Sequence, residues 1–318
     1  MANSIPSRPG QAALAGDARA LMLDVFGGEV LTAFQVATTM RDKHMVKTLE
    51  KGRQFKFPAI WRTNVGYHTP GVEITGDQIP HTEIIVTPDE KLVSSVFVAD
   101  IDEILLHYDV RGPYAEELGN ALARFYDRNI IRRVTQAARG GALFSGDTGG
   151  AILTNAAYNT TATTLFDGLS LAKETMDGKD VPVNSVPLFA VMRPAQWYLL
   201  ARSDRNLNRD FNGGDANIRR MSITTVDEIT ILKSNNTPFG SNDSAVTSIP
   251  TKYRANFTNT VATVWTPMAA ATAEVQGLSS QIIDQPWKQG SLMLARLMVG
   301  TDPLRTKCAV ELVTAANP

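Results

Sequence analysis

One long stretch of helical periodicity, from Pro113 to Arg139, constrains the fold more than any other feature. Proline is favoured at the first position of a helix, and the pair Gly140-Gly141 predicts where the helix ends. Glutamates occupy the first turns and arginines the last turns, which complements the helix dipole at both ends. About 27 residues rising 1.5 Å each make a rod of roughly 40 Å, whereas helices in globular domains average about 11–12 residues. The sequence therefore predicts a structural spine helix over residues 113–139.

The residues before this helix are typical of an exposed β-ribbon. The outward leg starts near Val46, a turn follows at Pro70-Gly71, and the return leg runs through Ile84 to Val98. Pro58 lies inside the outward leg, and an internal proline suits an exposed ribbon better than a central strand. A two-stranded ribbon is marginally stable alone and cannot bury large side chains. We therefore expect neighbouring copies of the chain to cover its aromatic residues, which include Phe55, Phe57, Trp61 and Tyr67.

The ribbon region also has a split charge. Residues 41–62 contain seven basic and two acidic side chains, and residues 73–103 contain eight acidic side chains and one lysine. One interpretation is cross-strand pairing within a single hairpin. The other is a polar arm that binds neighbouring copies of the same protein. Charge alone does not separate the two interpretations, but the aromatic residues favour the arm.

The rest of the chain mixes short helices and strands, which gives an α+β fold class. A glycine-rich segment, Gly140 to Gly150, is interpreted as a flexible connector. The last segment, from Gln289 to Val313, predicts two strands joined by a Thr-Asp-Pro turn. The apolar periodicity from Ala12 to Phe34 predicts an amphipathic helix that is interrupted at Gly27-Gly28. Between these segments we predict helices over 163–176 and 194–201, and strands over 187–192, near Ile223, over 229–232 and over 261–266.

Composition excludes several classes of function. The formal net charge of −1 argues against a strongly basic DNA-binding protein. Cys308 is the single cysteine, so no intrachain disulfide is possible, and we expect it to be a small buried residue. No apolar run reaches the roughly 18 residues that a membrane helix needs. The first ten residues lack the apolar stretch of a secretory signal, so we expect the chain to stay in the cytosol.

No residue pattern predicts catalysis, a cofactor or a metal. The sequence Gly146-Asp147-Thr148-Gly149-Gly150 is similar to the active-site loop of trypsin-like proteases, but threonine replaces the nucleophilic serine. The four histidines lie in the first third of the chain, without the close helical spacing of a metal pair. We therefore predict no catalytic residues, no cofactor and no metal site, and keep a protease as a minor alternative.

Several short segments resemble one known family in the same order along the chain. They are Val25-Phe26-Gly27-Gly28-Glu29-Val30-Leu31-Thr32-Ala33-Phe34, His44-Met45-Val46, Phe57-Pro58, His81-Thr82-Glu83 and His107-Tyr108-Asp109-Val110-Arg111. The family is that of the major capsid proteins of short-tailed, Autographiviridae-type bacteriophages, which have the Hong Kong ninety-seven capsid fold. The resemblance is strong over residues 20–125 and weaker beyond the spine helix.

The resemblance implies a domain plan. Residues 1–49 would be the N-arm, 50–100 the extended loop, 101–161 the peripheral domain with the spine helix, 162–289 the axial domain, and 290–318 C-terminal strands returning to the peripheral domain. Contacts between subunits would involve Phe26, Lys51, Arg53, Phe55, Phe57, Trp61, Tyr67, Glu73 and Asp77.

The resemblance also implies a function. The chain would assemble as pentamers and hexamers into an icosahedral head, in the host bacterial cytoplasm, and become part of the virion. Its partners would be copies of itself, a scaffolding protein, a portal and packaged double-stranded DNA contacted without sequence preference. A cellular nanocompartment shell of the same fold is the main alternative.

Overall fold

A computed structural model describes residues 29–35, 37–50, 52–101, 111–203 and 225–317. The chain forms two compact units, and several long elements pass from one unit to the other. The first unit comprises Met1–Thr39, Asp89–Asp127 and Glu274–Val299, and the second comprises Met40–Pro88, Arg128–Ala273 and Gly300–Pro318.

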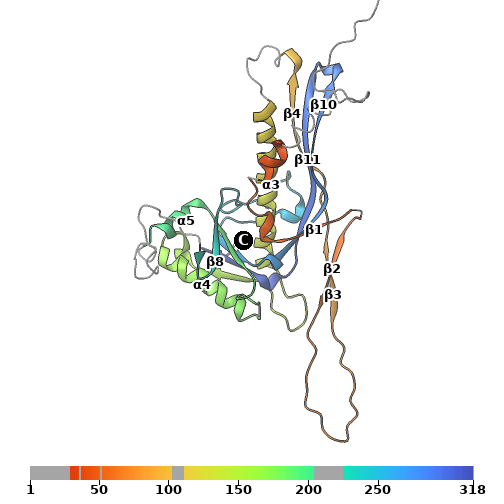
Figure 1. The fold of residues 1–318 in the computed structure, drawn as a ribbon. Coiled ribbons are helices and arrows are strands. Elements are labelled where there is room, and N and C mark those ends of the chain that lie inside the picture. The colour runs from red at the N-terminus through yellow and green to blue at the C-terminus, as the bar shows by residue number, and fades with distance from the viewer. Residues whose placement is uncertain (1–28, 36, 51, 102–110, 204–224, 318) are drawn as a thin grey trace, which may run out of the picture. The chain divides into compact units, whose positions relative to one another are not determined.

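The predicted spine helix is confirmed. Helix α3 spans Arg111–Ala138, within two residues of the prediction at each end (Figure 1). Its apolar face is buried, including Leu118, Leu122 and Val134. In the first unit, residues 29–35 are helical and pack against α3 at Gly119, where a Cβ atom would lie 2.7 Å from the carbonyl oxygen of Val30. This confirms the end of the predicted helix over residues 12–34, and its earlier part lies outside the described residues.

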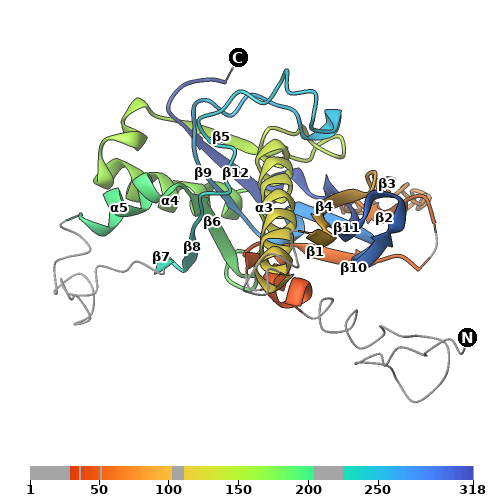
Figure 2. The same cartoon turned by 90° about the horizontal axis from the view of Figure 1, so that it is seen from above.

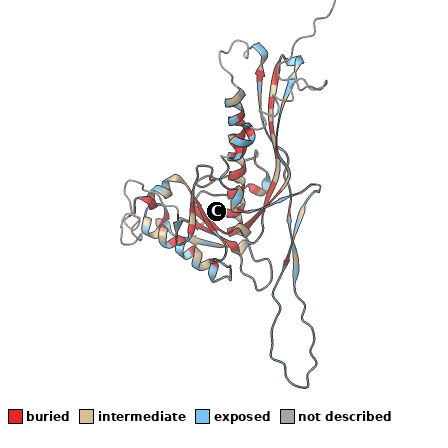
Figure 3. Cartoon of the chain, viewed as in Figure 1, coloured by how far each residue is buried: buried red, intermediate tan, exposed pale blue. Residues whose placement is uncertain are grey.

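A six-stranded mixed sheet forms the core of the second unit. The strand order is β5-β12-β9-β6-β8-β7. The sheet consists of β5 (Ala151–Thr154), β6 (Leu188–Met192), β7 (Thr225–Val226), β8 (Ile229–Lys233), β9 (Thr260–Trp265) and β12 (Ala309–Val313). Strand β12 is parallel to β5, β6 is parallel to β8, and the other pairs are antiparallel. All residues of β6, β9 and β12 are buried, as expected for strands covered on both faces (Figure 3).

Helices α4 (Ala162–Asp177) and α5 (Pro194–Ala201) lie beside this sheet, where α4 contacts β5, β9 and β12 (Figure 2). Both helices, β6, β8 and β9 agree with the predictions. The predicted strand near Ile223 lies outside the described residues. Short 3-10 helices occupy Arg41–Lys43, Ala156–Asn159, Thr251–Tyr253, Pro267–Ala269, Pro286–Lys288 and Thr306–Cys308.

A second sheet has four strands in the order β1-β10-β11-β4. They are β1 (Met45–Thr48), β4 (Leu92–Ala99), β10 (Ala270–Gln285) and β11 (Gly290–Pro303). This sheet corrects the predicted ribbon, because Val98 pairs with Ser291 of β11 and does not belong to a return leg. The predicted Thr-Asp-Pro turn is also wrong, since these residues end β11 and the chain turns over residues 304–308. Strand β10 was not predicted.

The ribbon itself is shorter than predicted. It pairs β2 (Phe55–Ile60) with β3 (His81–Val86) in antiparallel register, from Phe55 opposite Val86 to Ile60 opposite His81. Beyond this ribbon, residues 61–80 form a long loop that extends away from β2 and β3 (Figure 1).

The segment from Gly140 to Gly150 is not a simple flexible connector. The backbone N–H of Gly150 donates to the carbonyl oxygen of Gly140 at 2.9 Å, so the segment is a closed loop. A Cβ atom on Gly150 would overlap the backbone of Ala138, at the end of α3. The glycine is needed here because two backbone segments meet at close range.

Candidate assembly surfaces

The loop over residues 61–80 exposes apolar side chains that the described part of its own chain leaves uncovered. A hydrogen bond of 3.0 Å from the N–H of Trp61 to the carbonyl oxygen of Pro80 closes its base. Its tip is a turn in which Gly71 has φ +92° and the N–H of Val72 donates to the carbonyl oxygen of Thr69. Pro70 and Gly71 occupy the positions that a type II turn favours. Between base and tip, Val65 is 95% exposed and Tyr67 is fully exposed.

Two aromatic residues of the ribbon are partly buried by their own chain. Phe55 and Phe57 lie edge to face at 4.5 Å between ring centroids. Both pack against a buried cluster in the second unit formed by Val86, Ala271, Ala273 and Leu304. The described part of the chain thus covers part of these two side chains, whereas Tyr67 is fully exposed. A role of Phe55 and Phe57 in contacts between subunits stays a prediction.

Trp61 is also held within the chain. Its ring stacks on Phe144 with 5.3 Å between centroids. The cations of Arg62 and Lys307 lie 5.7 Å and 5.6 Å from its centroid. Such cation–π contacts stabilise a partly exposed tryptophan by roughly 0.5–1 kcal/mol each. Trp61 thus fixes the position where the long loop leaves the ribbon.

The charged residues of the ribbon region fall into two groups, one paired within the ribbon and one exposed. Lys56 pairs with Glu83 across the ribbon at 2.6 Å, as the hairpin interpretation predicts. The remaining members predicted to contact neighbours, Arg53, Glu73 and Asp77, are exposed and form no ion pair within the described residues. These three charges are therefore available to a partner. Phe26 and Lys51, which were also predicted at subunit contacts, lie outside the described residues.

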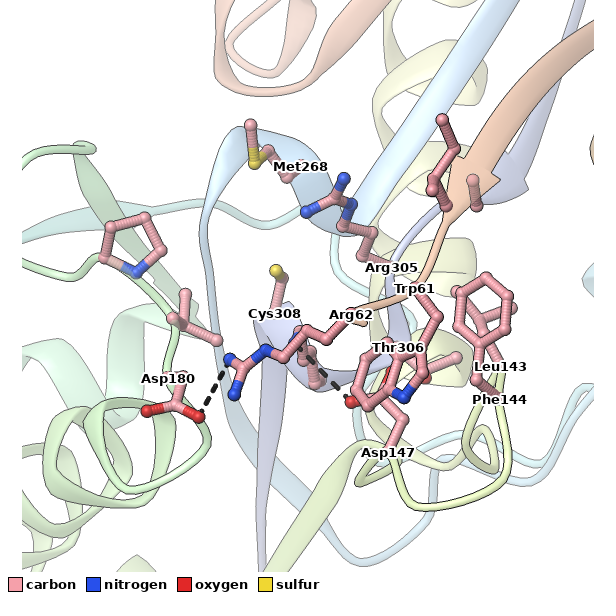
Figure 4. A pocket seen from close by; sticks show the side chains of 15 residues that line it. Trp61, Arg62, Leu143, Phe144, Asp147, Asp180, Met268, Arg305, Thr306 and Cys308 are labelled. Atoms are coloured by element: carbon pink, nitrogen blue, oxygen red, sulfur yellow. Dashed lines mark hydrogen bonds and ion pairs between the residues drawn. The ribbon is translucent and has the colours of Figure 1, made fainter. Parts of the chain in front are cut away.

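A cavity of about 210 Å³ lies at the base of the long loop (Figure 4). Trp61 and Phe144 lie together on one side, and Arg62 binds Asp180 on another side at 2.9 Å. Lys307 lies 3.5 Å from Asp147. The cavity is further lined by Ile60, Val181, Pro182, Met268, Arg305, Thr306 and Cys308. Arg305 is exposed and has no carboxylate partner among the described residues, so the lining has three cations and two carboxylates.

Sequence reasoning did not find this cavity. Its walls come from segments around residues 60, 144, 180, 268 and 306, which are distant in the sequence. The prediction that Cys308 is a buried small residue is confirmed, and burial raises the pKa of its thiol.

Asp147 and His44, residues considered for catalysis or for a metal site, form hydrogen bonds or ion pairs with other residues of the chain. Asp147 accepts a hydrogen bond from the N–H of Thr148 at 2.9 Å and faces Lys307. His44 is buried and contacts the carbonyl oxygen of Met40 and the hydroxyl of Thr272. In the described part of the chain, no group of three His, Cys, Asp or Glu side chains lies close enough to hold a metal ion. None of the described helices is both long and apolar enough to cross a membrane.

Three arginines at the end of the spine helix anchor it within the second unit. Arg132 binds Asp243 at 2.6 Å, and Arg133 binds Asp302 at 2.7 Å. Arg139 holds both carboxylate oxygens of Glu311 at 2.6 Å. Helix-dipole complementarity explains the arginines only in part, because their carboxylate partners lie more than a hundred residues away in the sequence.

A family model described as "Gp10A-like: Major capsid protein" matches residues 56–313. The chain belongs to this family of major capsid proteins. The architecture agrees with this family. A chain in the capsid structure of cyanophage P-SCSP1u is 35% identical to this chain and superimposes with a TM-score of 0.79. The match covers 100% of both chains. The predicted Hong Kong ninety-seven capsid fold and the family resemblance are thereby confirmed.

Other capsid proteins match less of the chain or at lower identity. The major capsid protein of Escherichia phage T7 is 39% identical over 122 residues, which are 38% of this chain and 35% of the T7 protein. The match thus spans about a third of the length of this curated relative. A chain of the mature capsid of bacteriophage PhiM1 shares the fold with a TM-score of 0.75 at 16% identity, and the match covers 88% of each chain.

Proposed function

We propose that this chain assembles with copies of itself, as pentamers and hexamers, into the icosahedral head of a bacteriophage. The observation that carries the proposal is the family match over residues 56–313, which includes the exposed loop over residues 61–80. A chain that exposes Val65 and Tyr67 so fully needs a partner surface to remove them from water. Repeated copies of the same chain supply such a surface in a symmetric shell.

The proposal includes the division into N-arm, extended loop, peripheral domain, axial domain and C-terminal strands that the family resemblance implies. Residues 162–289 would contact one another around five-fold and six-fold centres, and α3 would stiffen the peripheral part. The shell would form in the host bacterial cytoplasm and become the virion capsid.

The proposed partners besides the chain itself are a scaffolding protein, a portal and packaged double-stranded DNA. With a net charge of −1, the chain would attract DNA only through local basic patches. Such contacts are screened by salt and carry no sequence information. We expect DNA binding by the inner surface to be weak and lost at high ionic strength.

We also infer that the chain has a structural role and no catalytic role. The family is one of major capsid proteins, and no hydrogen bond within the described residues joins the hydroxyl of Thr148, at the nucleophile's position of the protease motif, to a basic side chain. A cellular nanocompartment shell is the alternative of the same fold. The two differ in content, because a phage head encloses double-stranded DNA and a nanocompartment encloses protein cargo.

A charge reversal in the exposed loop tests the proposal. The chain is expressed with its scaffolding protein, and particles are counted by sedimentation. The double change Glu73→Lys and Asp77→Lys is expected to lower particle yield, because unfavourable charge contacts recur at every copy. The unassembled protein should keep its circular dichroism spectrum.

The matched control reverses two exposed acids elsewhere, Glu90→Lys and Glu116→Lys, and should assemble normally. Normal assembly of the loop variant at low salt would contradict a role for these charges. A monomer in every sample, the unmodified chain included, would contradict the proposed assembly itself.

A further inference from the structure

We propose that the cavity at the base of the long loop receives the loop of a second copy, residues 63–80, with Tyr67 as the inserted side chain. This inference rests on the proposed assembly and names the surface that accepts the loop.

The cavity has the chemistry to hold an aromatic side chain. Trp61 and Phe144 supply stacked rings, and Met268 and Pro182 add apolar lining. Aromatic anchors placed in preformed pockets dominate the free energy of many protein interfaces. A volume of about 210 Å³ leaves room for a side chain rather than for a single ordered water.

The charges of cavity and loop are complementary. In the cavity, Arg62 and Lys307 already face Asp180 and Asp147, whereas Arg305 is exposed and without a carboxylate partner in the described chain. Residues 63–80 contain two carboxylates, Glu73 and Asp77, and no lysine or arginine. An acidic loop that carries exposed apolar side chains therefore fits a cavity with one unpaired cation.

The loop does not fill the cavity of its own chain, since Tyr67 is fully exposed and is not part of the cavity lining. The cavity includes Trp61 and Arg62, where the loop begins, and the loop extends outward to the turn at Pro70-Gly71. Nine residues at about 3.3 Å each span at most roughly 30 Å, so an extended loop can bridge to a neighbouring copy. The proposed contact between loop and cavity joins two copies.

Such a contact joins different surfaces on the two copies. Heterologous contacts of this kind close into rings when the rotation between copies allows it. Each copy in the ring would donate one loop and accept one loop, so the proposed contact suits a pentamer or a hexamer.

Site-specific photocrosslinking tests this directly. The photoreactive residue p-benzoylphenylalanine replaces Tyr67 in particles assembled from a mixture of isotopically light and heavy chains. Irradiation should join Tyr67's position on one copy to peptides from residues 141–147 or 303–309 of another copy, seen as light–heavy crosslinks by mass spectrometry. The same probe at the exposed Ile101 serves as the control and should not label these peptides.

A charge exchange provides an independent test. Arg305→Glu should lower particle yield at least tenfold, and adding Glu73→Arg should recover a large part of it. Lys91→Glu, which reverses another exposed cation, should assemble normally. Circular dichroism of the unassembled chains checks that each variant folds.

The outcomes separate this inference from the proposed function. If particles form and position 67 crosslinks only to other regions, the cavity is not the acceptor, although the shell proposal stands. Failure of the exchanged pair to recover assembly, with both variants folded, would also overturn the inference. If the unmodified chain forms no particles, the proposed function fails first.

Discussion

Removing the Arg139 side chain should destabilise the second unit strongly. Glu311 lies in β12, an inner strand of the six-stranded sheet, and is completely buried. Arg139 donates two hydrogen bonds to its carboxylate, each 2.6 Å long. Arg139→Met would leave a buried carboxylate without its countercharge, which typically costs about 3–5 kcal/mol.

The structure favours the lower end of that range. After the change, the hydroxyl of Thr260 still donates to Glu311 at 2.6 Å, and Asn317 still lies 3.4 Å from it. We therefore expect a loss of about 3 kcal/mol in the free energy of unfolding. The double change Arg139→Met and Glu311→Leu removes both charges and should recover at least half of that loss.

Urea unfolding of the unassembled chain measures these changes. Arg124→Met is the matched control on the same helix, because Arg124 pairs with Glu117 at the exposed surface. Exposed pairs contribute only about 0–1 kcal/mol, so this control should change stability little. A loss below about 1 kcal/mol for Arg139→Met, or a double variant less stable than the single one, would show that the buried Glu311 does not depend on Arg139 for its stability.

Three further predictions concern pH, packing and covalent chemistry. Burial lowers the pKa of His44 from 6.5 to about 4, so folding favours its neutral form. The contribution of this shift to the free energy of unfolding is complete above pH 6.5 and decreases as the pH falls toward 4, by roughly 2 kcal/mol at pH 5. In the His44→Gln variant, the free energy of unfolding measured in urea should lose this part of its decrease between pH 7 and pH 5. An unchanged pH dependence would contradict the role of His44. Gly150→Ala should unfold at a clearly lower temperature than the unmodified chain, because the new methyl group meets the backbone of Ala138, whereas Gly141→Ala has open space and should change the melting temperature little. Mature particles boiled in denaturant should run as one band near 34.6 kDa, and a ladder resistant to boiling and reductant would reveal covalent crosslinks.

Sequence periodicity predicts elements whose stabilisation is local. The ends of α3 follow from Pro113 and Gly140, and α5 begins at Pro194 as a helix-starting proline predicts. The fully buried strand β6 is readable from its continuous apolar run.

Elements that depend on distant partners were missed. Strand β10 contains mostly small and polar residues, with Gly277 in its middle, and has no strong alternation of its own. The cover of Phe55 and Phe57 comes partly from Ala271 and Leu304, more than two hundred residues away. Sequence patterns carry no signal for such pairings, so these aromatic residues were assigned to neighbouring copies.

The cavity was missed for the same reason. Arg305 is one exposed cation among many in the sequence, and only the fold places it beside Trp61 and Phe144. Tyr67, Glu73 and Asp77 were predicted at a contact surface because no local partner was evident, and their described environment leaves that prediction open to experiment.

Electron cryomicroscopy of particles from cells expressing the chain with its scaffolding protein is the decisive experiment for the proposed assembly. We expect closed icosahedral shells in which this chain forms both pentamers and hexamers, with residues 61–80 of each copy lying on a neighbour. A monodisperse monomer under these conditions, or an assembly in which residues 61–80 touch no other copy, would contradict the proposed assembly.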